Sequence, residues 1–201
     1  MTKAKRRVRT HYVRPITAAP VYDVVESTGN KVIPLPWDVY FLNIAEAVKL
    51  RSSCMRRQVG AVIVKDKRLL STGYNGTPRG ITNCNDGGCP RCNSKAPSGT
   101  ALDECICVHA ETNAIAQAAK AGICIDGGTM YCTLFPCKDC AKLMINAGII
   151  EVIIGSDNYN ADVIAQAMKL FVEAAIRVVC GDTGTDADLD AYVKGRPMRH
   201  G

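Results

Sequence analysis

Apolar residues recur at a helical spacing across residues 37–51 and then change to the spacing of strands. In the first segment, intervals of three and four residues predict a helix with one apolar face, formed by Phe41, Ile44, Ala45 and Val48. Residues 59–64 and 68–73 are rich in aliphatic side chains and predict two strands. The short turn Lys65-Asp66-Lys67 joins them, so we expect a hairpin.

Two further helices are predicted by their composition and by the residues that bound them. Residues 110–121 are rich in alanine and precede Gly122, which predicts a buried helix that ends at the glycine. Residues 136–146 predict a second helix, which Pro136 opens and Gly148 closes.

Strands are expected to alternate with these helices through the second half of the chain. We expect strands at 129–135, 149–155 and 176–180, and a last helix at 161–174. The whole pattern predicts an α/β fold with a five-stranded mixed sheet between helices, which is a three-layer α/β/α sandwich.

Composition and charge divide the chain into a body and two extensions. Hydrophobic residues make up 47% of the chain, and no run approaches the roughly 20 apolar residues that span a bilayer. We expect a basic, flexible arm at 1–36, one domain at 37–180 and a polar tail at 181–201. A solvated arm is favoured over a targeting segment or a nucleic-acid contact. The net charge of +6 equals the charge of the arm's first basic residues, Lys3, Lys5, Arg6, Arg7, Arg9 and Arg14.

Two short motifs carry the candidate chemistry, His109-Ala110-Glu111 and Pro136-Cys137-Lys138-Asp139-Cys140. One imidazole and two thiolates are zinc ligands, and three protein ligands leave a fourth position for water. Zinc can lower the pKa of that water to about 7, and Glu111 is then placed to move protons. Both motifs lie where a helix is expected to begin, which favours the thiolate form of Cys137. This pattern is a signature of zinc nucleobase deaminases.

Two other interpretations use the same residues. Cys137 and Cys140 alone form a Cys-x-x-Cys pair of the kind found in thioredoxin-like redox proteins. That interpretation leaves His109 and Glu111 without a role. A structural zinc site would need a fourth protein ligand, which Glu111 can supply, although its spacing from His109 suits a proton shuttle better.

The long segment 74–108 contains no predicted helix or strand and is rich in cysteine. The chain has 11 cysteines and no secretory signal, so we expect a reducing, cytoplasmic compartment and metal binding rather than disulfides. We hypothesise a second, structural zinc that holds the segment closed. By spacing alone, Cys89-x-x-Cys92 and Cys105-x-Cys107 form a four-thiolate set; a few buried or free thiols are the alternative.

From about Trp37 to about Val179 the chain resembles the deoxycytidylate (dCMP) deaminase family, within the cytidine deaminase superfamily. The resemblance implies the cytidine-deaminase-like fold and zinc-dependent hydrolysis of dCMP to dUMP and ammonia, which supplies dUMP for dTMP synthesis. It rests on the runs Arg51-Ser52-Ser53-Cys54, Val59-Gly60-Ala61-Val62-Ile63-Val64, Gly73-Tyr74-Asn75-Gly76-Thr77-Pro78-Arg79-Gly80, Val108-His109-Ala110-Glu111-Thr112-Asn113-Ala114-Ile115 and Pro136-Cys137-Lys138-Asp139-Cys140-Ala141-Lys142.

The resemblance also assigns roles to residues. Glu111 is the implied proton shuttle. His109, Cys137 and Cys140 are the implied ligands of the catalytic zinc. For the second zinc the likeness favours Cys54, Cys84, Cys89 and Cys105 over the set given by spacing.

Substrate contacts follow only from the likeness. Asn75 is expected near the sugar, Thr133 to Phe135 along the base pocket, and Tyr159 near the phosphate. Arg79 and Lys138 are candidate phosphate partners by charge and position, but each is equally explained as a surface residue, and Phe135 is equally explained by packing.

The resemblance also implies how the protein is regulated and assembled. Many members of the family are hexamers that dCTP activates and dTTP inhibits with Mg²⁺, through a site near the Gly-Tyr-Asn-Gly loop.

Two other functions stay open: a non-catalytic interaction protein with this fold, and a deaminase of single-stranded nucleic acid. The first does not need Glu111, and the second normally uses aromatic stacking platforms, whereas this chain has one Trp and three Phe.

Overall fold

A computed structural model describes residues 34–97, 99–155 and 160–180. Residues 1–33 of the predicted arm and the predicted tail at 181–201 lie outside the described residues. The helices are α1 (Trp37–Lys49), α2 (Pro90–Asn93), α3 (Ala110–Ala121), α4 (Lys138–Asn146) and α5 (Ala161–Glu173). The strands are β1 (Gly60–Lys65), β2 (Arg68–Tyr74), β3 (Thr129–Cys132), β4 (Glu151–Ile154) and β5 (Arg177–Cys180).

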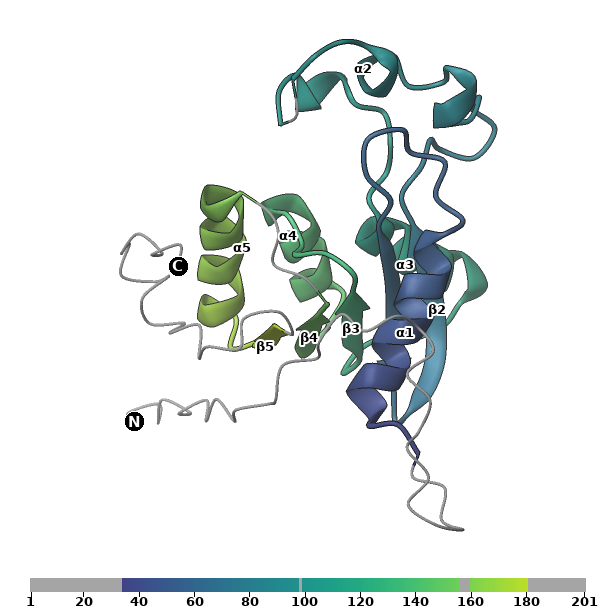
Figure 1. The fold of residues 1–201 in the computed structure, drawn as a ribbon. Coiled ribbons are helices and arrows are strands. Elements are labelled where there is room, and N and C mark those ends of the chain that lie inside the picture. Colours follow the sequence, from purple (N-terminus) through teal and green to yellow (C-terminus); the bar gives the residue numbers. More distant parts are fainter. Residues whose placement is uncertain (1–33, 98, 156–159, 181–201) are drawn as a thin grey trace, which may run out of the picture.

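The five strands form one mixed sheet in the order β2-β1-β3-β4-β5 (Figure 1). β1 pairs antiparallel with both β2 and β3, whereas β3, β4 and β5 run parallel to one another. The hairpin turn consists of Asp66 and Lys67, which both have positive φ, as a two-residue turn between twisted strands requires. The predicted five-stranded mixed sheet is confirmed.

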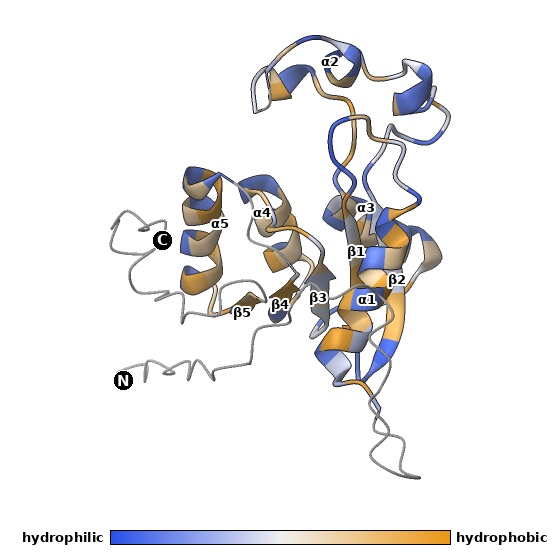
Figure 2. Cartoon of the chain, viewed as in Figure 1, coloured by the Kyte–Doolittle hydropathy of each residue, from blue (hydrophilic) through white to orange (hydrophobic). Residues whose placement is uncertain are grey.

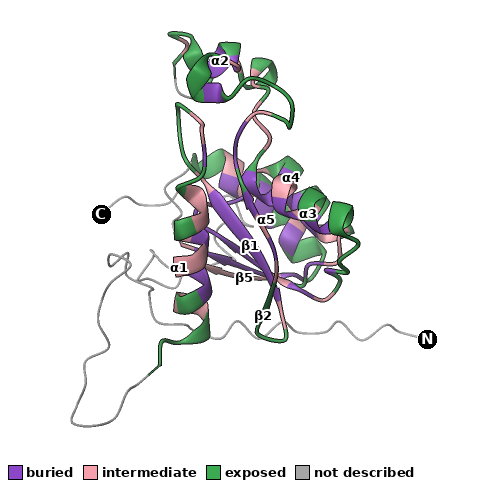
Figure 3. Cartoon of the chain, turned by 90° about the vertical axis from the view of Figure 1, so that its right-hand side faces the viewer, coloured by how far each residue is buried: buried purple, intermediate pink, exposed green. Residues whose placement is uncertain are grey.

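Helices cover both faces of the sheet, so the predicted three layers are present. Figure 3 shows α1 on one side of the strands and α3, α4 and α5 on the other. Alternate residues of β1 explain how both faces are buried. Val62 and Val64 pack beneath α1 with Phe41, whereas Ala61 and Ile63 belong to the larger core on the other face. In Figure 2, α1 and α5 show alternating apolar and polar patches, as expected of helices that cover a core.

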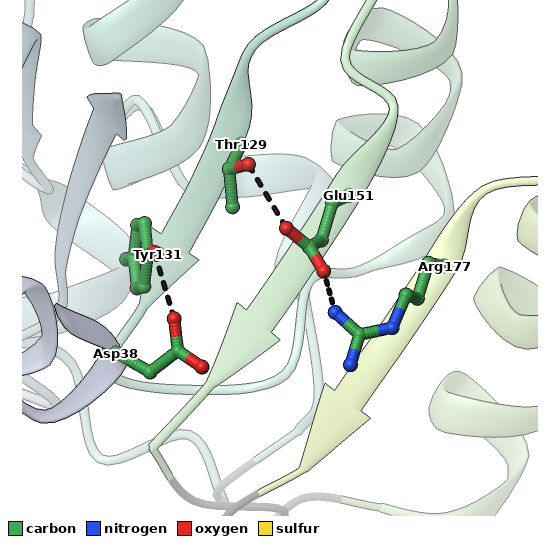
Figure 4. A network of polar contacts seen from close by, with 5 residues as sticks. All are labelled: Asp38, Thr129, Tyr131, Glu151 and Arg177. Atoms are coloured by element: carbon green, nitrogen blue, oxygen red, sulfur yellow. Dashed lines mark hydrogen bonds and ion pairs between the residues drawn. The ribbon is translucent and has the colours of Figure 1, made fainter. Parts of the chain in front are cut away.

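A polar network on the face beneath α1 fixes the register of the parallel strands (Figure 4). Glu151 on β4 accepts a hydrogen bond from Thr129 on β3 at 3.1 Å and forms an ion pair with Arg177 on β5. Both partners lie opposite Glu151 in the strand register. Tyr131 donates a hydrogen bond to Asp38 of α1 at 3.0 Å, and burial raises the pKa of Tyr131, which keeps the hydroxyl protonated.

The cysteine-rich segment 75–108 extends away from the sheet as a separate lobe, which we call the cysteine lobe (Figure 1). It contains α2 and two short 3₁₀ turns, Cys84–Asp86 and Leu102–Glu104, where the sequence predicted an irregular segment. Its two ends meet at an isolated bridge between Gly76 and Val108.

None of the helices that the structure describes combines the length and the apolar character of a membrane-spanning segment.

Candidate metal centre and its cavity

Two helix starts bring the candidate zinc ligands together. His109 is the N-cap residue of α3 and Cys137 is the N-cap residue of α4, while Cys140 lies in the first turn of α4. The sequence predicted that α4 begins at Pro136, but the helix begins two residues later. Cys137 is extended, and its carbonyl oxygen accepts the first helical hydrogen bond from Ala141. Both α3 and α4 therefore direct their N-terminal ends at one point.

The ligand atoms have the spacing of a tetrahedral zinc site. His109 Nδ1 lies 3.4 Å from Cys137 Sγ and 3.4 Å from Cys140 Sγ, and these three residues form one group that can hold a metal ion. Zn–N and Zn–S bonds of about 2.1 and 2.3 Å at a tetrahedral angle separate N and S by about 3.6 Å. The donor set and its geometry fit zinc with one coordination position left open.

The lowered pKa of Cys137 prepares one of the three ligands to bind a cation. A hydrogen bond from the Cys140 thiol, with a second contact to His109, lowers the pKa of Cys137 well below its ordinary value. The same hydrogen bond and burial raise the pKa of Cys140, and the Cys137 thiolate raises the pKa of His109 to about 9. One thiolate is therefore already present, and metal binding would release protons from the other two ligands.

Glu111 is buried beside this group and is not one of its members. Its side chain is 4% exposed, and burial raises the pKa of its carboxyl group above the ordinary value. A raised pKa brings a carboxylic acid closer to the pH at which it both accepts and delivers protons. Glu111 thus has the environment of a general acid–base residue.

A cavity of about 540 Å³ opens onto His109, Glu111 and Cys137. Of the predicted substrate contacts, Asn75 and Phe135 line it, together with Leu134. Thr133 does not line the cavity, and its buried hydroxyl instead accepts a hydrogen bond from Gly60 N at 3.1 Å. Arg79 and Lys138 do not line it either, and Tyr159 lies outside the described residues.

Asn75 connects the cavity to the start of β1. Its side-chain oxygen accepts hydrogen bonds from Ser52 Oγ at 2.7 Å and from Val59 N at 2.8 Å. Its amide nitrogen donates to the Arg57 carbonyl oxygen at 2.8 Å. The residue is buried, so it holds the segment between α1 and β1 in place as well as lining the cavity.

Three arginines that sequence reasoning did not single out line the cavity: Arg56, Arg57 and Arg91. Arg56 and Arg57 lie two and three residues after Cys54, and their position near a predicted cysteine ligand was the available signal. Arg91 lies between Cys89 and Cys92, in the cysteine lobe. The lining of the cavity therefore includes cationic side chains, which we call the arginine wall, as well as two of the candidate metal ligands.

The remaining predicted ligands form two overlapping groups, which consist of cysteines of the lobe and of Cys54, a residue between α1 and β1. Cys54 and Cys84 form one group with Cys92 and Cys107, and Cys89 and Cys105 form the other with the same two residues. The set favoured by resemblance, Cys54, Cys84, Cys89 and Cys105, is thus divided between the two groups. The set given by spacing alone, in contrast, is the whole of the second group.

The comparisons with known proteins agree with this geometry. The model of the family described as "Cytidine and deoxycytidylate deaminase zinc-binding region" matches residues 35–156. The chain is 47% identical over 126 residues to deoxycytidylate deaminase of Schizosaccharomyces pombe, which is 63% of this chain and 38% of that protein. It is 42% identical over 158 residues to deoxycytidylate deaminase of Saccharomyces cerevisiae, which is 77% of this chain and 49% of that protein.

The chain thus spans half or less of the length of these two relatives. Among solved structures, it is similar to the dCMP deaminase of the cyanophage S-TIM5 in complex with dCMP and dUMP, with 31% identity and a TM-score of 0.56. The similarity covers 70% of this chain and 93% of the phage protein.

Proposed function

The chain belongs to the cytidine and deoxycytidylate deaminase family, and from this premise we propose that it hydrolyses dCMP to dUMP and ammonia, supplying dUMP for dTMP synthesis. The observation that carries the proposal is the buried Glu111, which lines the same cavity as His109 and Cys137, two of the three candidate zinc ligands. A redox pair or a structural zinc site has no use for a buried carboxylate beside an open coordination position.

In the proposed reaction, water replaces the amino group at C4 of cytosine. Zinc held by His109, Cys137 and Cys140 would supply a Lewis acid that acidifies water at neutral pH. Glu111 accepts a proton from the attacking water and delivers it to N3, and it then moves a second proton to the departing ammonia. Phe135 and Leu134 exclude solvent from the base.

The arginine wall favours a nucleotide over a free nucleoside. Arg57 is an exposed residue that lines the cavity, and its guanidinium carries a positive charge. We therefore propose Arg57 as a partner of the substrate phosphate. Guanidinium groups bind phosphate through charge-assisted hydrogen bonds.

A substrate panel tests the proposed function. Purified zinc-replete protein is incubated with dCMP, dCTP, deoxycytidine and a cytosine-containing oligonucleotide, and ammonia release is measured. We expect dCMP to give the highest kcat/KM, because the cavity of about 540 Å³ is lined by arginines that can bind a phosphate. Preference for the oligonucleotide, or no release from any compound by protein that contains zinc, would contradict the proposal.

Replacement of Arg57 tests the phosphate contact. In Arg57→Gln we expect KM for dCMP to rise roughly 10–100-fold, the value of one charge-assisted hydrogen bond, with little change for deoxycytidine. Arg79→Gln is the matched control, because Arg79 does not line the cavity and should leave both values unchanged. An equal loss with both substrates, or a larger loss in the control, would assign the phosphate elsewhere.

The finer family properties are proposals of the same kind. We propose a homo-oligomer, a hexamer as in many members, that dCTP activates and dTTP inhibits with Mg²⁺. We also propose a cytoplasmic location. This location follows the expectation that the 11 cysteines of the chain bind metal in a reducing compartment instead of forming disulfides.

A further inference from the structure

The cysteine lobe is built around sulfur instead of aliphatic side chains. Its buried core cluster contains only Cys84, Cys89 and Cys92, with Cys54, Cys105 and Cys107 packed against it. Leu102 and Ile106, two of the lobe's large apolar residues, are exposed. A segment of this size without an apolar core normally needs disulfides or a metal to fold.

The distances between the sulfur atoms are longer than disulfide bonds and match metal coordination. Cys92 Sγ lies 4.0 Å from Cys54 Sγ, 3.7 Å from Cys105 Sγ and 4.0 Å from Cys107 Sγ, and Cys89 Sγ lies 3.8 Å from Cys105 Sγ. A disulfide bond is about 2.05 Å long. Two thiolates on one tetrahedral zinc ion, at Zn–S bonds of about 2.3 Å, lie about 3.8 Å apart.

The grouping of the six sulfurs points to two ions. Each of the two groups has four thiols within 4.8 Å of one another, and Cys92 and Cys107 belong to both. Two tetrahedral ions need eight ligand positions, and six thiolates fill them when two thiolates bridge. We propose that the cysteine lobe holds a binuclear zinc–thiolate cluster, in which Cys92 and Cys107 bridge the ions. Cys54 and Cys84 complete one ion, and Cys89 and Cys105 complete the other.

A buried arginine supplies part of the charge that an anionic cluster would require. Two Zn²⁺ ions and six thiolates leave a net charge of minus two. Arg91 is 4% exposed, and its guanidinium donates hydrogen bonds to the carbonyl oxygens of Thr100 and Pro97. Among the described residues, no carboxylate forms an ion pair with Arg91. Because a buried charge is normally paired, an anionic cluster accounts for this arginine.

The cluster would also join the lobe to the proposed active site. Cys54 follows α1, whereas Cys107 lies two residues before His109 and directly before Val108, which pairs with Gly76. Cys54, Cys92, Cys105 and Cys107 line the same cavity as Glu111. The two ions therefore hold together three chain segments that form one wall of the substrate cavity.

Metal analysis of the full chain tests the proposal. The zinc-replete protein, after removal of loosely bound metal, is expected to contain three zinc ions per chain, one at the His109 centre and two in the lobe. His109→Ala should contain two, and Cys124→Ser, which changes an exposed cysteine outside the lobe, should contain three. Two or fewer ions in the unmodified protein would overturn the binuclear cluster.

Ligand variants and cadmium NMR identify the bridges. Cys54→Ser and Cys89→Ser should each lower the zinc content by about one ion, and Cys92→Ser by about two. If the lobe held a single ion with only four of the six cysteines as ligands, replacing either of the other two cysteines would leave the zinc content unchanged. That result would contradict the proposal. In the cadmium-loaded unmodified protein, scalar coupling between two tetrathiolate cadmium signals is expected from shared sulfurs; two uncoupled signals would exclude bridging.

These measurements are independent of the proposed deaminase activity. Protein with three zinc ions and no activity toward dCMP would retain the cluster and refute the function. Protein with two zinc ions and full activity would retain the function and refute the cluster.

Discussion

Replacing Glu111 by glutamine is expected to lower kcat for dCMP by roughly 10³-fold while the zinc content stays unchanged. Glutamine has nearly the same shape as a protonated glutamate, so the packing around this 4%-exposed side chain is preserved. It can neither accept the proton of water nor deliver one to N3. The loss therefore isolates proton transfer from metal binding, because the ligand group consists of His109, Cys137 and Cys140.

The measurement combines steady-state kinetics with metal analysis of the same sample. Glu173→Gln is the matched control, since Glu173 is an exposed carboxylate on α5 and should not affect either quantity. A Glu111→Gln protein that deaminates at nearly the unmodified rate would show that another group moves the protons. A protein that loses its zinc would instead make Glu111 a metal ligand or a support for the ligands.

The periodic elements were predictable because their signals are local. The aliphatic run of β1 and the alanine-rich stretch of α3 each depend on residues close in sequence, and the observed bounds agree within a few residues. The strand predicted at 129–135 is shorter in the structure and ends at Cys132. At position 133, directly after β3, the Thr133 hydroxyl accepts the hydrogen bond from Gly60 N in place of a backbone carbonyl oxygen. The regular hydrogen-bond ladder between β1 and β3 therefore ends before this residue.

The candidate catalytic centre was predictable for a similar reason. Its ligands lie within one turn of two helix starts, so short motifs with recognisable boundaries bring them together. The lobe differs, because the arrangement of its cysteines depends on the path of the whole segment 75–108. Spacing identified Cys89 with Cys92 and Cys105 with Cys107, but it gave no reason to place Cys92 and Cys107 in both groups.

The cavity wall was missed because cationic residues near a motif are ordinary surface residues in most sequences. Only the fold of the lobe places Arg91 against the cavity that Arg57 also lines. Arg79 and Lys138 have the same charge and lie in stronger motifs, but neither of them lines that cavity. Charge and motif membership therefore did not determine which arginines line the cavity.

Replacing Gly73 by alanine is expected to destabilise the protein by about 3 kcal/mol, at the upper end for overpacking. A methyl group at Gly73 on β2 would collide with the carbonyl oxygen of Ala110 and the backbone nitrogen of Ala114, both in α3. Neither atom can rotate away as a flexible side chain does. Moreover, Ser71 Oγ donates a hydrogen bond to the Ala114 carbonyl oxygen at 2.7 Å, which fixes the same approach.

The collision falls on the first turns of α3, which carry His109 and Glu111. A shift of this helix by about 1 Å would lower kcat/KM as well, by on the order of 10²-fold. For a chain of 201 residues, the loss of stability corresponds to a decrease in Tm of roughly 6–12 °C. Thermal unfolding and dCMP kinetics on the zinc-replete variant measure the two effects.

Gly155→Ala supplies the matched control for this close approach. Gly155 directly follows β4, and an added methyl group would meet its nearest neighbours, Thr133 O, Cys132 O and Leu42, at 3.6–3.7 Å, an ordinary packing distance. Its Tm should change little, because no backbone atom must move. If Gly73→Ala were as stable and as active as this control, β2 and α3 would have room that the structure does not show, and the tight approach would not position Glu111.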